Sequence, residues 1–288
     1  SEDLPGALTA GVPSDIAVSR PGQNARYTFP GTAGQGAGIE FAQLAMTPSG
    51  PTLYLYVLKP DGSMLGYGSA TSGGAFVNVG SLPVTGTYSV LLDAAHGAAF
   101  TGKLTPDPGT PAEIDGAMQA LATTMAGETV RHTFAGTSVA RVNVGLDGLA
   151  YSPAGSSATT LSVYRPDGGY VAGASCYPSN PGGGCEAAMP VALPSTGTYS
   201  VIVSPPAGAL LAGGRLAVST PLAGTLQVGG GEQTVAIARP AQTARYTFSG
   251  TAAQLLRLNW TGASVSIAGA TAVTVSVLKP DGSTLTTA

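Results

Sequence analysis

The residues that could carry acid–base or nucleophilic chemistry are few and lie far apart in the chain. There are two histidines, His96 and His132. His132 stands where two similar segments have tyrosine, which favours a strand residue over a catalytic base. His96 follows Asp93 by three residues, but no nucleophile accompanies this pair in the local sequence. A Gly-x-Ser-x-Gly elbow and a phosphate-binding loop ending in Gly-Lys-Ser/Thr do not occur in the sequence. The sequence therefore predicts no catalytic residues and no enzyme activity.

The two cysteines, Cys176 and Cys185, enclose a short loop rich in proline and glycine. Two cysteines with no histidine nearby fall short of a zinc site, and their spacing is not that of a Cys-x-x-Cys redox pair. Both cysteines of a chain within one short loop indicate a local disulfide, and therefore an oxidising compartment outside the cytosol. We expect a secreted or cell-surface protein.

Several tyrosines could form a binding surface. Exposed aromatic rings stack on sugars and form protein contacts, although tyrosine at alternate strand positions also covers a sheet without binding anything. Both interpretations stay open. The candidate surface-binding residues are Tyr54, Tyr56, Tyr164, Tyr170 and Tyr177.

The chain contains an internal repeat, recognised by three short sequence motifs that we call marks. The residues named above lie within the repeated units. Arg20–Phe29 recurs as Arg239–Phe248, and a weaker copy includes Arg131–Phe134. A Pro-Asp-Gly sequence then follows at 60–62, 166–168 and 280–282, and the interval from the arginine at 26, 131 or 245 to the aspartate is 35, 36 or 36 residues. The third mark, Leu-Pro-x-Thr-Gly-Thr-Tyr-Ser-Val, begins at residues 82 and 193. Chance does not conserve three such intervals, so we predict homologous units at 1–105, 106–220 and 221–288. The third unit lacks the third mark, and we expect it to be either truncated or completed by another chain.

Each unit has the pattern of β-strands. Apolar residues alternate with polar or tyrosine residues before each Pro-Asp-Gly, as in Leu53–Val57 and Val273–Val277. Pro-Asp-Gly suits a tight turn, and the 64 glycines and prolines separate many short apolar runs. The stretch between the second and third marks is five residues longer in the second unit, where the cysteines lie. We therefore predict an all-β fold of tandem antiparallel, jelly-roll-like sandwiches, with the disulfide at the tip of a hairpin in the second unit.

Together, the three marks resemble the bacterial pre-peptidase C-terminal (PPC) β-sandwich, as repeated in large secreted proteins of the RHS/YD-repeat type. The resemblance spans nearly the whole chain and implies a compact sandwich used as a spacer, adhesion or substrate-binding module. Members in collagenases bind calcium through clustered carboxylates near the start of the domain. Asp3, Asp15 and Glu232 form no such cluster here, so no cofactor is expected.

The charge and composition of the chain limit the kinds of partner that it can bind. Charged residues make up 9% of the chain against about 25% in a typical soluble protein, and the net charge is -3. Nucleic-acid binding is disfavoured because no basic stripe is present, and no apolar run reaches the roughly 20 residues of a membrane span. A weakly charged surface suits close packing. We expect a structural or adhesive protein, such as a filament or surface-layer subunit, that associates through sheet edges. The alternative is a carbohydrate- or matrix-binding appendage of a larger enzyme or toxin.

Overall fold

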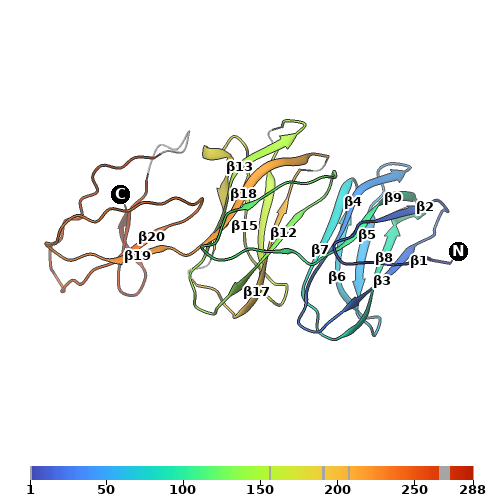
Figure 1. The fold of residues 1–288 in the computed structure, drawn as a ribbon, viewed down its shortest axis with the longest axis horizontal. Coiled ribbons are helices and arrows are strands. Elements are labelled where there is room, and N and C mark those ends of the chain that lie inside the picture. Colours follow the sequence, from blue (N-terminus) through green and yellow to red (C-terminus); the bar gives the residue numbers. More distant parts are fainter. Residues whose placement is uncertain (1, 156, 190–191, 207, 266–272, 288) are drawn as a thin grey trace.

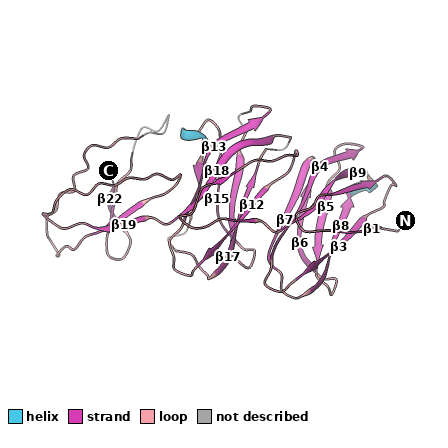
Figure 2. Cartoon of the chain, in the orientation of Figure 1, coloured by secondary structure: helices cyan, strands magenta, loops and turns pink. Residues whose placement is uncertain are grey.

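The computed structural model describes residues 2–155, 157–189, 192–206, 208–265 and 273–287, and almost all of its regular structure is β (Figures 1 and 2). Within these ranges the helical segments are two short 3-10 turns, η1 (Ala95–Gly97) and η2 (Pro181–Gly183). The prediction of an all-β fold is confirmed. The described part of the chain contains no helix long and apolar enough to cross a membrane.

Strands β1 to β9, which we call unit 1, form two sheets. The first has the order β1-β3-β8-β5-β6 and the second β2-β9-β4-β7. Consecutive strands often change sheet, so each sheet joins segments that are distant in sequence. The strands are β1 (Leu4–Ala7), β2 (Ser14–Val18), β3 (Ala25–Gly31), β4 (Gly36–Thr47), β5 (Leu53–Leu58), β6 (Met64–Ala70), β7 (Gly73–Ser81), β8 (Gly86–Ala94) and β9 (Ala99–Asp107).

The two sheets of unit 1 pack face to face over one apolar core. Leu53, Leu55 and Val57 of β5 are fully buried, as the alternating pattern of this segment predicts. Phe41 and Phe100 of the second sheet meet edge to face with ring centroids 6.1 Å apart. Each such buried side chain contributes about 1.5–3 kcal/mol by leaving water. The shared core makes unit 1 a β-sandwich.

Strands β10 to β18, which we call unit 2, repeat the same two strand orders. Its sheets run β10-β12-β17-β14-β15 and β11-β18-β13-β16, which matches unit 1 strand for strand. A second core lies between them. The strands are β10 (Thr110–Pro111), β11 (Gln119–Ala120), β12 (Val130–Gly136), β13 (Asn143–Ser152), β14 (Thr159–Tyr164), β15 (Tyr170–Cys176), β16 (Cys185–Glu186), β17 (Gly197–Ser204) and β18 (Leu210–Ser219).

The first strand of each unit departs from the antiparallel pattern. β1 pairs with β3 in parallel, in the register Leu4 to Ala25, and β10 pairs with β12 in parallel. The intervening strand, β2 or β11, lies in the opposite sheet, so the chain crosses the sandwich and returns in its original direction. Parallel neighbours require such a crossover.

Residues 222–287, which we call unit 3, contain β19 (Leu222–Thr225), β20 (Ala244–Thr247), β21 (Ser276–Leu278) and β22 (Thr284–Thr287) in their described part. The parallel pairing of β19 with β20 reproduces that of β1 with β3, and β21 with β22 reproduces β5 with β6. In unit 1, β8 lies between β3 and β5, and β17 has the same place in unit 2. Apolar residues of unit 3 such as Leu255, Leu258 and Leu285 are exposed.

The recurrent Gly-Thr-Tyr sequence builds the same buried anchor in units 1 and 2. The Tyr88 hydroxyl donates to the Val84 carbonyl at 2.6 Å, and the Tyr199 hydroxyl donates to the Ser195 carbonyl at 2.8 Å. Both tyrosines are fully buried. Each ring leaves no room for a side chain at the glycine that ends the facing strand, Gly31 or Gly136. This geometry resembles a tyrosine corner, which fixes a turn against the following strand.

The Pro-Asp-Gly sequences are turns in all three units. In the first, Asp61 Oδ1 accepts a hydrogen bond from the Ser63 amide at 2.9 Å, and Gly62 has a φ of +81°. Asp167 and Asp281 accept from the corresponding amides in the same way. The aspartates recur because the turn recurs, with the carboxylate serving the backbone.

Candidate binding surfaces

Tyr54, Tyr56 and Tyr67 lie on the outer face of the first sheet of unit 1. Tyr54 and Tyr56 alternate with the buried residues of β5, and their rings stack with centroids 6.1 Å apart. Tyr67 on β6 stands directly opposite Tyr56 and is 64% exposed. The three residues therefore gather on one side of a hairpin that Pro60, Asp61 and Gly62 close.

In unit 2 the candidate tyrosines are more dispersed. Tyr164 and Tyr170 are cross-strand partners whose rings meet edge to face with centroids 5.9 Å apart. Tyr170 is 62% exposed, whereas Tyr177 lies beyond the end of β15, beside the disulfide loop. The residues at the positions of Tyr54 and Tyr56 are Thr160 and Ser162. Unit 2 thus carries a smaller aromatic surface than unit 1.

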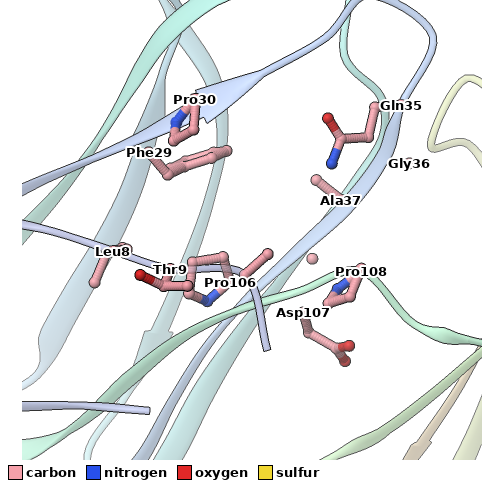
Figure 3. Close-up of a pocket in the computed structure, with 12 residues that line it drawn as sticks. Leu8, Thr9, Phe29, Pro30, Gln35, Gly36, Ala37, Pro106, Asp107 and Pro108 are labelled. Atoms are coloured by element: carbon pink, nitrogen blue, oxygen red, sulfur yellow. The ribbon is translucent and has the colours of Figure 1, made fainter. Parts of the chain in front are cut away.

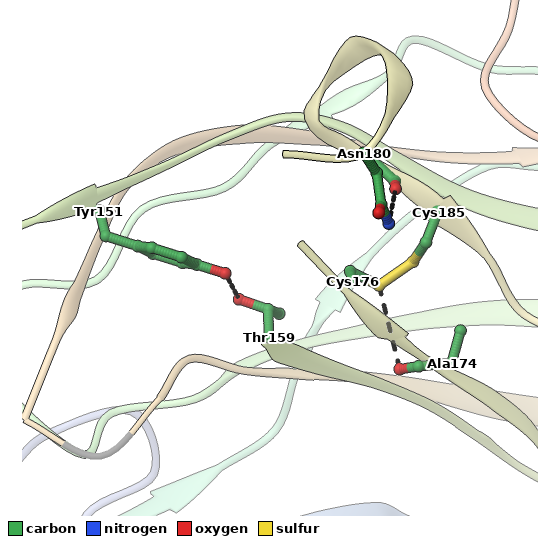
Figure 4. The surroundings of a disulfide bond; sticks show 7 residues. Tyr151, Thr159, Ala174, Cys176, Asn180 and Cys185 are labelled. Atoms are coloured by element: carbon green, nitrogen blue, oxygen red, sulfur yellow. Dashed lines mark hydrogen bonds between the residues drawn. A yellow bond between two sulfur atoms is a disulfide. The ribbon is translucent and has the colours of Figure 1, made fainter. Parts of the chain in front are cut away.

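Cys176 and Cys185 form the predicted disulfide, but its place in the fold differs from the prediction (Figure 4). Cys176 ends β15 in the first sheet of unit 2, and Cys185 begins β16 in the second sheet. The bond therefore joins the edges of two sheets and is not at the tip of a hairpin. Cys176 is fully buried in the unit 2 core, and the Asn180 side chain closes the loop by donating to the Gly184 carbonyl at 2.9 Å.

His132 is part of the structure of β12. It is 4% exposed, its Nδ1 lies 3.2 Å from the Thr110 carbonyl, and burial lowers the pKa of the imidazole. In units 1 and 3 the equivalent pairs are Gly6 with Tyr27 and Gly224 with Tyr246, where the tyrosine ring occupies the space of a Cβ on the glycine. The smaller imidazole leaves room for Thr110, so His132 fits a packing requirement.

His96 lies in η1 with a φ of +57° and is exposed. The carboxylates considered for calcium are held by cations instead: Asp3 Oδ2 lies 3.1 Å from Arg26 Nε, and Asp15 Oδ1 lies 2.6 Å from Lys103 Nζ. Glu232 is exposed. Among the described residues, no cluster of three metal-ligating side chains is found.

The junction between units 1 and 2 contains two buried charged groups, Glu40 and the repeat arginine Arg131. Glu40 on β4 is 5% exposed and accepts a hydrogen bond from the Thr129 amide of unit 2. Burial raises the pKa of this carboxyl to about 7. Arg131 of unit 2 is 3% exposed and donates to the Pro108 carbonyl at 2.7 Å and to the Ser200 hydroxyl at 2.8 Å. Its guanidinium fits beside unit 1 because Gly36 and Gly38 have no side chains there.

Backbone contacts complete this junction. The Gln43 amide donates to the Ala126 carbonyl at 2.8 Å, and the Ser81 amide donates to the Pro166 carbonyl at 2.9 Å. The Pro-Asp-Gly turn of unit 2 is therefore seated on β7 of unit 1. A Cβ on Gly80 would lie 2.4 Å from the Gly168 nitrogen, so the two backbones are in direct contact. Such close approach holds the units in a fixed relation.

A pocket of about 190 Å³ opens beside this junction (Figure 3). Phe29, Leu8 and proline side chains form most of its wall, and Asp107 contributes a carboxylate. Asp107 Oδ1 accepts from the Gly109 amide at 2.7 Å, and burial raises the pKa of its carboxyl. By strand register, Ala10 in this wall corresponds to Ile114, which packs against the core of unit 2. The pocket is present in unit 1 because alanine stands there at the position of isoleucine in unit 2.

A wider groove of about 760 Å³ lies at the junction of units 2 and 3. It contains two arginines, Arg141 and Arg245, and no carboxylate lines its described wall. Sequence reasoning identified Arg131 and Arg245 only as members of the repeat, and it identified neither Arg141 nor Glu40. The usable signal was departure from the repeat: Arg141 stands at the position of Gly36, and Glu40 at that of Gly145.

No family model matches the chain, and no curated protein is similar to it at a significant level.

Proposed function

We propose that this chain is a non-catalytic structural or adhesive protein in which sandwich units of the PPC-like type stack into a stiff rod. The observation that carries the proposal is the junction between units 1 and 2, where Glu40 is buried against Thr129 and the Gly80 and Gly168 backbones touch. A flexible tether would leave these groups in water. In Figure 1 the units follow one another along the longest axis of the molecule.

A glycine pair tests the stiffness of the rod. Gly80 and Gly148 have φ values of +67° and +62°, so alanine is strained at both, but only the Cβ at 80 meets the neighbouring unit. Gly80→Ala is expected to separate the units and broaden the distribution of particle shapes in small-angle scattering and negative-stain images. Gly148→Ala is the matched control and is expected to keep the wild-type shape. Identical scattering from both variants would refute the stiff junction.

The disulfide supports a location outside the cytosol, because such bonds persist in oxidising compartments. A secreted or cell-surface protein is the corresponding proposal. Comparing the thiol content of chain recovered from culture medium with that of chain retained in cells tests it. Recovery of the chain only from the reducing interior of the cells, with free thiols at Cys176 and Cys185, would count against this location.

Association through sheet edges is the proposed mode of assembly. In units 1 and 2 a Gly-Thr-Tyr strand, β8 or β17, pairs on both sides, whereas β20 pairs only with β19 among the described residues. An added strand could extend this sheet by β-augmentation. A synthetic peptide of residues 193–204 is expected to protect the Ala244–Thr247 amides from hydrogen exchange. A peptide with Val201→Pro is the control, and equal effects from both peptides would reject edge pairing.

A carbohydrate- or matrix-binding appendage is the second candidate, and the Tyr54, Tyr56 and Tyr67 cluster favours it. Stacked and half-exposed rings on a sheet face suit a sugar ring. Glycan and matrix-protein arrays with wild-type chain, Tyr56→Ala and the control Met64→Ala test this function. Binding that Tyr56→Ala abolishes and Met64→Ala leaves intact would support it, whereas binding unaffected by Tyr56→Ala would reject the tyrosine surface.

A further inference from the structure

The arginine of the repeat has an acidic neighbour in units 1 and 2 but not in unit 3. By strand register Arg26, Arg131 and Arg245 occupy equivalent positions beside the first strand of their units. Arg26 pairs with Asp3 at 3.1 Å, and the charge of Asp107 acts on Arg131. The residue of unit 3 at the position of Asp3 is Pro221, so Arg245 lacks the acid that its counterparts have.

Arg141 adds a second positive charge at this place. Its counterpart in unit 1 is Gly36, against which the Arg131 guanidinium lies in the first junction. In the second junction an arginine replaces that glycine, and both Arg141 and Arg245 line the groove and are exposed. Among the described residues neither has an ion-pair partner, since the five salt bridges of the structure involve other residues. Two like charges that share one groove favour an anion between them.

The other lining groups indicate the kind of anion. Thr225 and Thr247 provide hydroxyl groups, whereas the Thr220 hydroxyl donates to Asp115 Oδ2 at 2.7 Å. Val139, Pro221 and Ala223 provide small apolar surfaces. Guanidinium groups bind carboxylates through paired, charge-assisted hydrogen bonds, and threonine hydroxyls exchange hydrogen bonds with sugar hydroxyls. The groove volume of about 760 Å³ falls within the range of small-ligand sites.

We propose that the groove between units 2 and 3 binds a carboxylate-bearing sugar of an acidic glycan, with Arg141 and Arg245 holding the carboxylate. This inference is independent of the rod proposal and of the tyrosine surface, because its residues lie in another part of the molecule. A failure of this site would leave the scattering and tyrosine experiments unaffected.

Calorimetric titration of residues 1–288 with a trimer of galacturonic acid tests the site. Binding is expected, it should weaken as salt rises, and galactotriose should bind at least about tenfold more weakly because it lacks the charge. Arg141→Gly and Arg245→Gln are each expected to reduce affinity about tenfold or more. Arg257→Gln, at an exposed arginine outside the groove, is the matched control and is expected to keep the wild-type affinity.

Pro221→Asp gives the sharpest variant, because it restores the acid of the other units. It is expected to pair with Arg245 and abolish trimer binding while the melting temperature stays at or above that of the wild-type chain. No binding of the trimer by the wild-type chain, or an equal loss in Arg257→Gln, would overturn the proposal. Tighter binding of triglutamate than of the uronate trimer would overturn the glycan assignment in favour of an acidic protein segment.

Discussion

At the scale of single residues, the buried tyrosines explain why the third sequence mark recurs. The Tyr88 hydroxyl both donates to the Val84 carbonyl and accepts from the Val84 amide, and its ring stacks on Phe29 with centroids 5.5 Å apart. Threonine and glycine before it supply the turn that the ring anchors. The pattern in the sequence therefore has a specific structural cause.

We expect Tyr88→Phe to lower the free energy of unfolding by about 1–2 kcal/mol, because the Val84 backbone groups lose their partner. Chemical denaturation followed by circular dichroism measures this loss. Tyr67→Phe is the control, since that side chain is 64% exposed. An equal stability of the two variants would contradict the anchoring role of the buried hydroxyl.

Glu40 makes the stability of the first junction depend on pH. Its pKa is about 7 in the folded chain, above the ordinary 4.5, because burial disfavours the charged form; Glu128 and Asp107 add to this effect and the Thr129 amide opposes it. The folded state therefore holds a proton that the unfolded state releases, and stability falls as pH rises from about 4.5 to about 7.

We expect Glu40→Gln to remove this contribution, which is on the order of 3 kcal/mol. The melting temperatures of wild-type and variant chains at pH 5 and pH 8 check it. At pH 8 the melting temperature of the variant is expected to rise relative to that of the wild-type chain, because the neutral amide still accepts a hydrogen bond from the Thr129 amide. Asp107 and His132 titrate in both chains, so the difference between them isolates Glu40. A wild-type advantage that grows toward pH 8 would contradict the burial of the carboxyl.

At the scale of strands, the disulfide helps to hold an edge strand of unit 2 that has little backbone pairing. β7 of unit 1 pairs with β4 over most of its nine residues, whereas its counterpart β16 has two residues and pairs with β13 only at Gly145 and Leu146. The covalent bond holds this short strand against the end of β15. The longer loop between the cysteines is therefore tolerated.

Replacing both cysteines with alanine is expected to destabilise unit 2 by about 2–3 kcal/mol, from the loop-closure entropy of a short loop. Hydrogen exchange resolved by peptide is the appropriate measurement, because unit 1 serves as an internal reference. Faster exchange in β13 and β15, with β4 and β6 unchanged, is expected. Uniform acceleration across both units would indicate that the bond stabilises the chain as a whole.

The strands were easier to predict than their partners. Alternation in Leu53–Val57 identifies a strand with one buried face, and the structure confirms it, because burial follows the period of two directly. Pairing partners depend on how the chain crosses the sandwich, so neither the parallel β1–β3 pair nor the linkage of two sheets by Cys176 and Cys185 follows from local pattern. Glu40 and Arg141 could not be predicted for a different reason. They stand at positions where the units differ, and a repeat pattern says nothing about such positions.

At the scale of the whole molecule, each of the first two units has a core of its own. The core of unit 1 is built from residues 8–104 and that of unit 2 from residues 112–218. In the described part of the chain, the contacts between these two units include those of Glu40, Gln43 and Ser81 and the approach of Gly80 to Gly168. The predicted boundaries near residues 106 and 221 therefore become testable as limits of independent folding.

We expect a fragment of residues 1–107 to fold cooperatively, because its strands pair with one another and its core needs no residue of unit 2. Thermal unfolding monitored by circular dichroism and the dispersion of amide signals in NMR check this. Leu55→Ala in the same fragment, at a fully buried position, is expected to cost about 2–5 kcal/mol and is the control for a packed core. A fragment without a cooperative transition would refute the boundary.

The first junction also gives a row of units a direction, because the two units meet through different surfaces. Unit 1 contributes the outer face of β4 and β7, and unit 2 contributes a loop at 126–129 and a turn at 166–168, so the two partners present different surfaces. Contacts of this heterologous kind have no twofold axis, so they do not close as a pair. A row of units joined in this way has two different ends, and the side chains at a junction can differ, as Arg141 at the position of Gly36 shows. The number of units in a row and the side chains exposed at each junction can then vary separately.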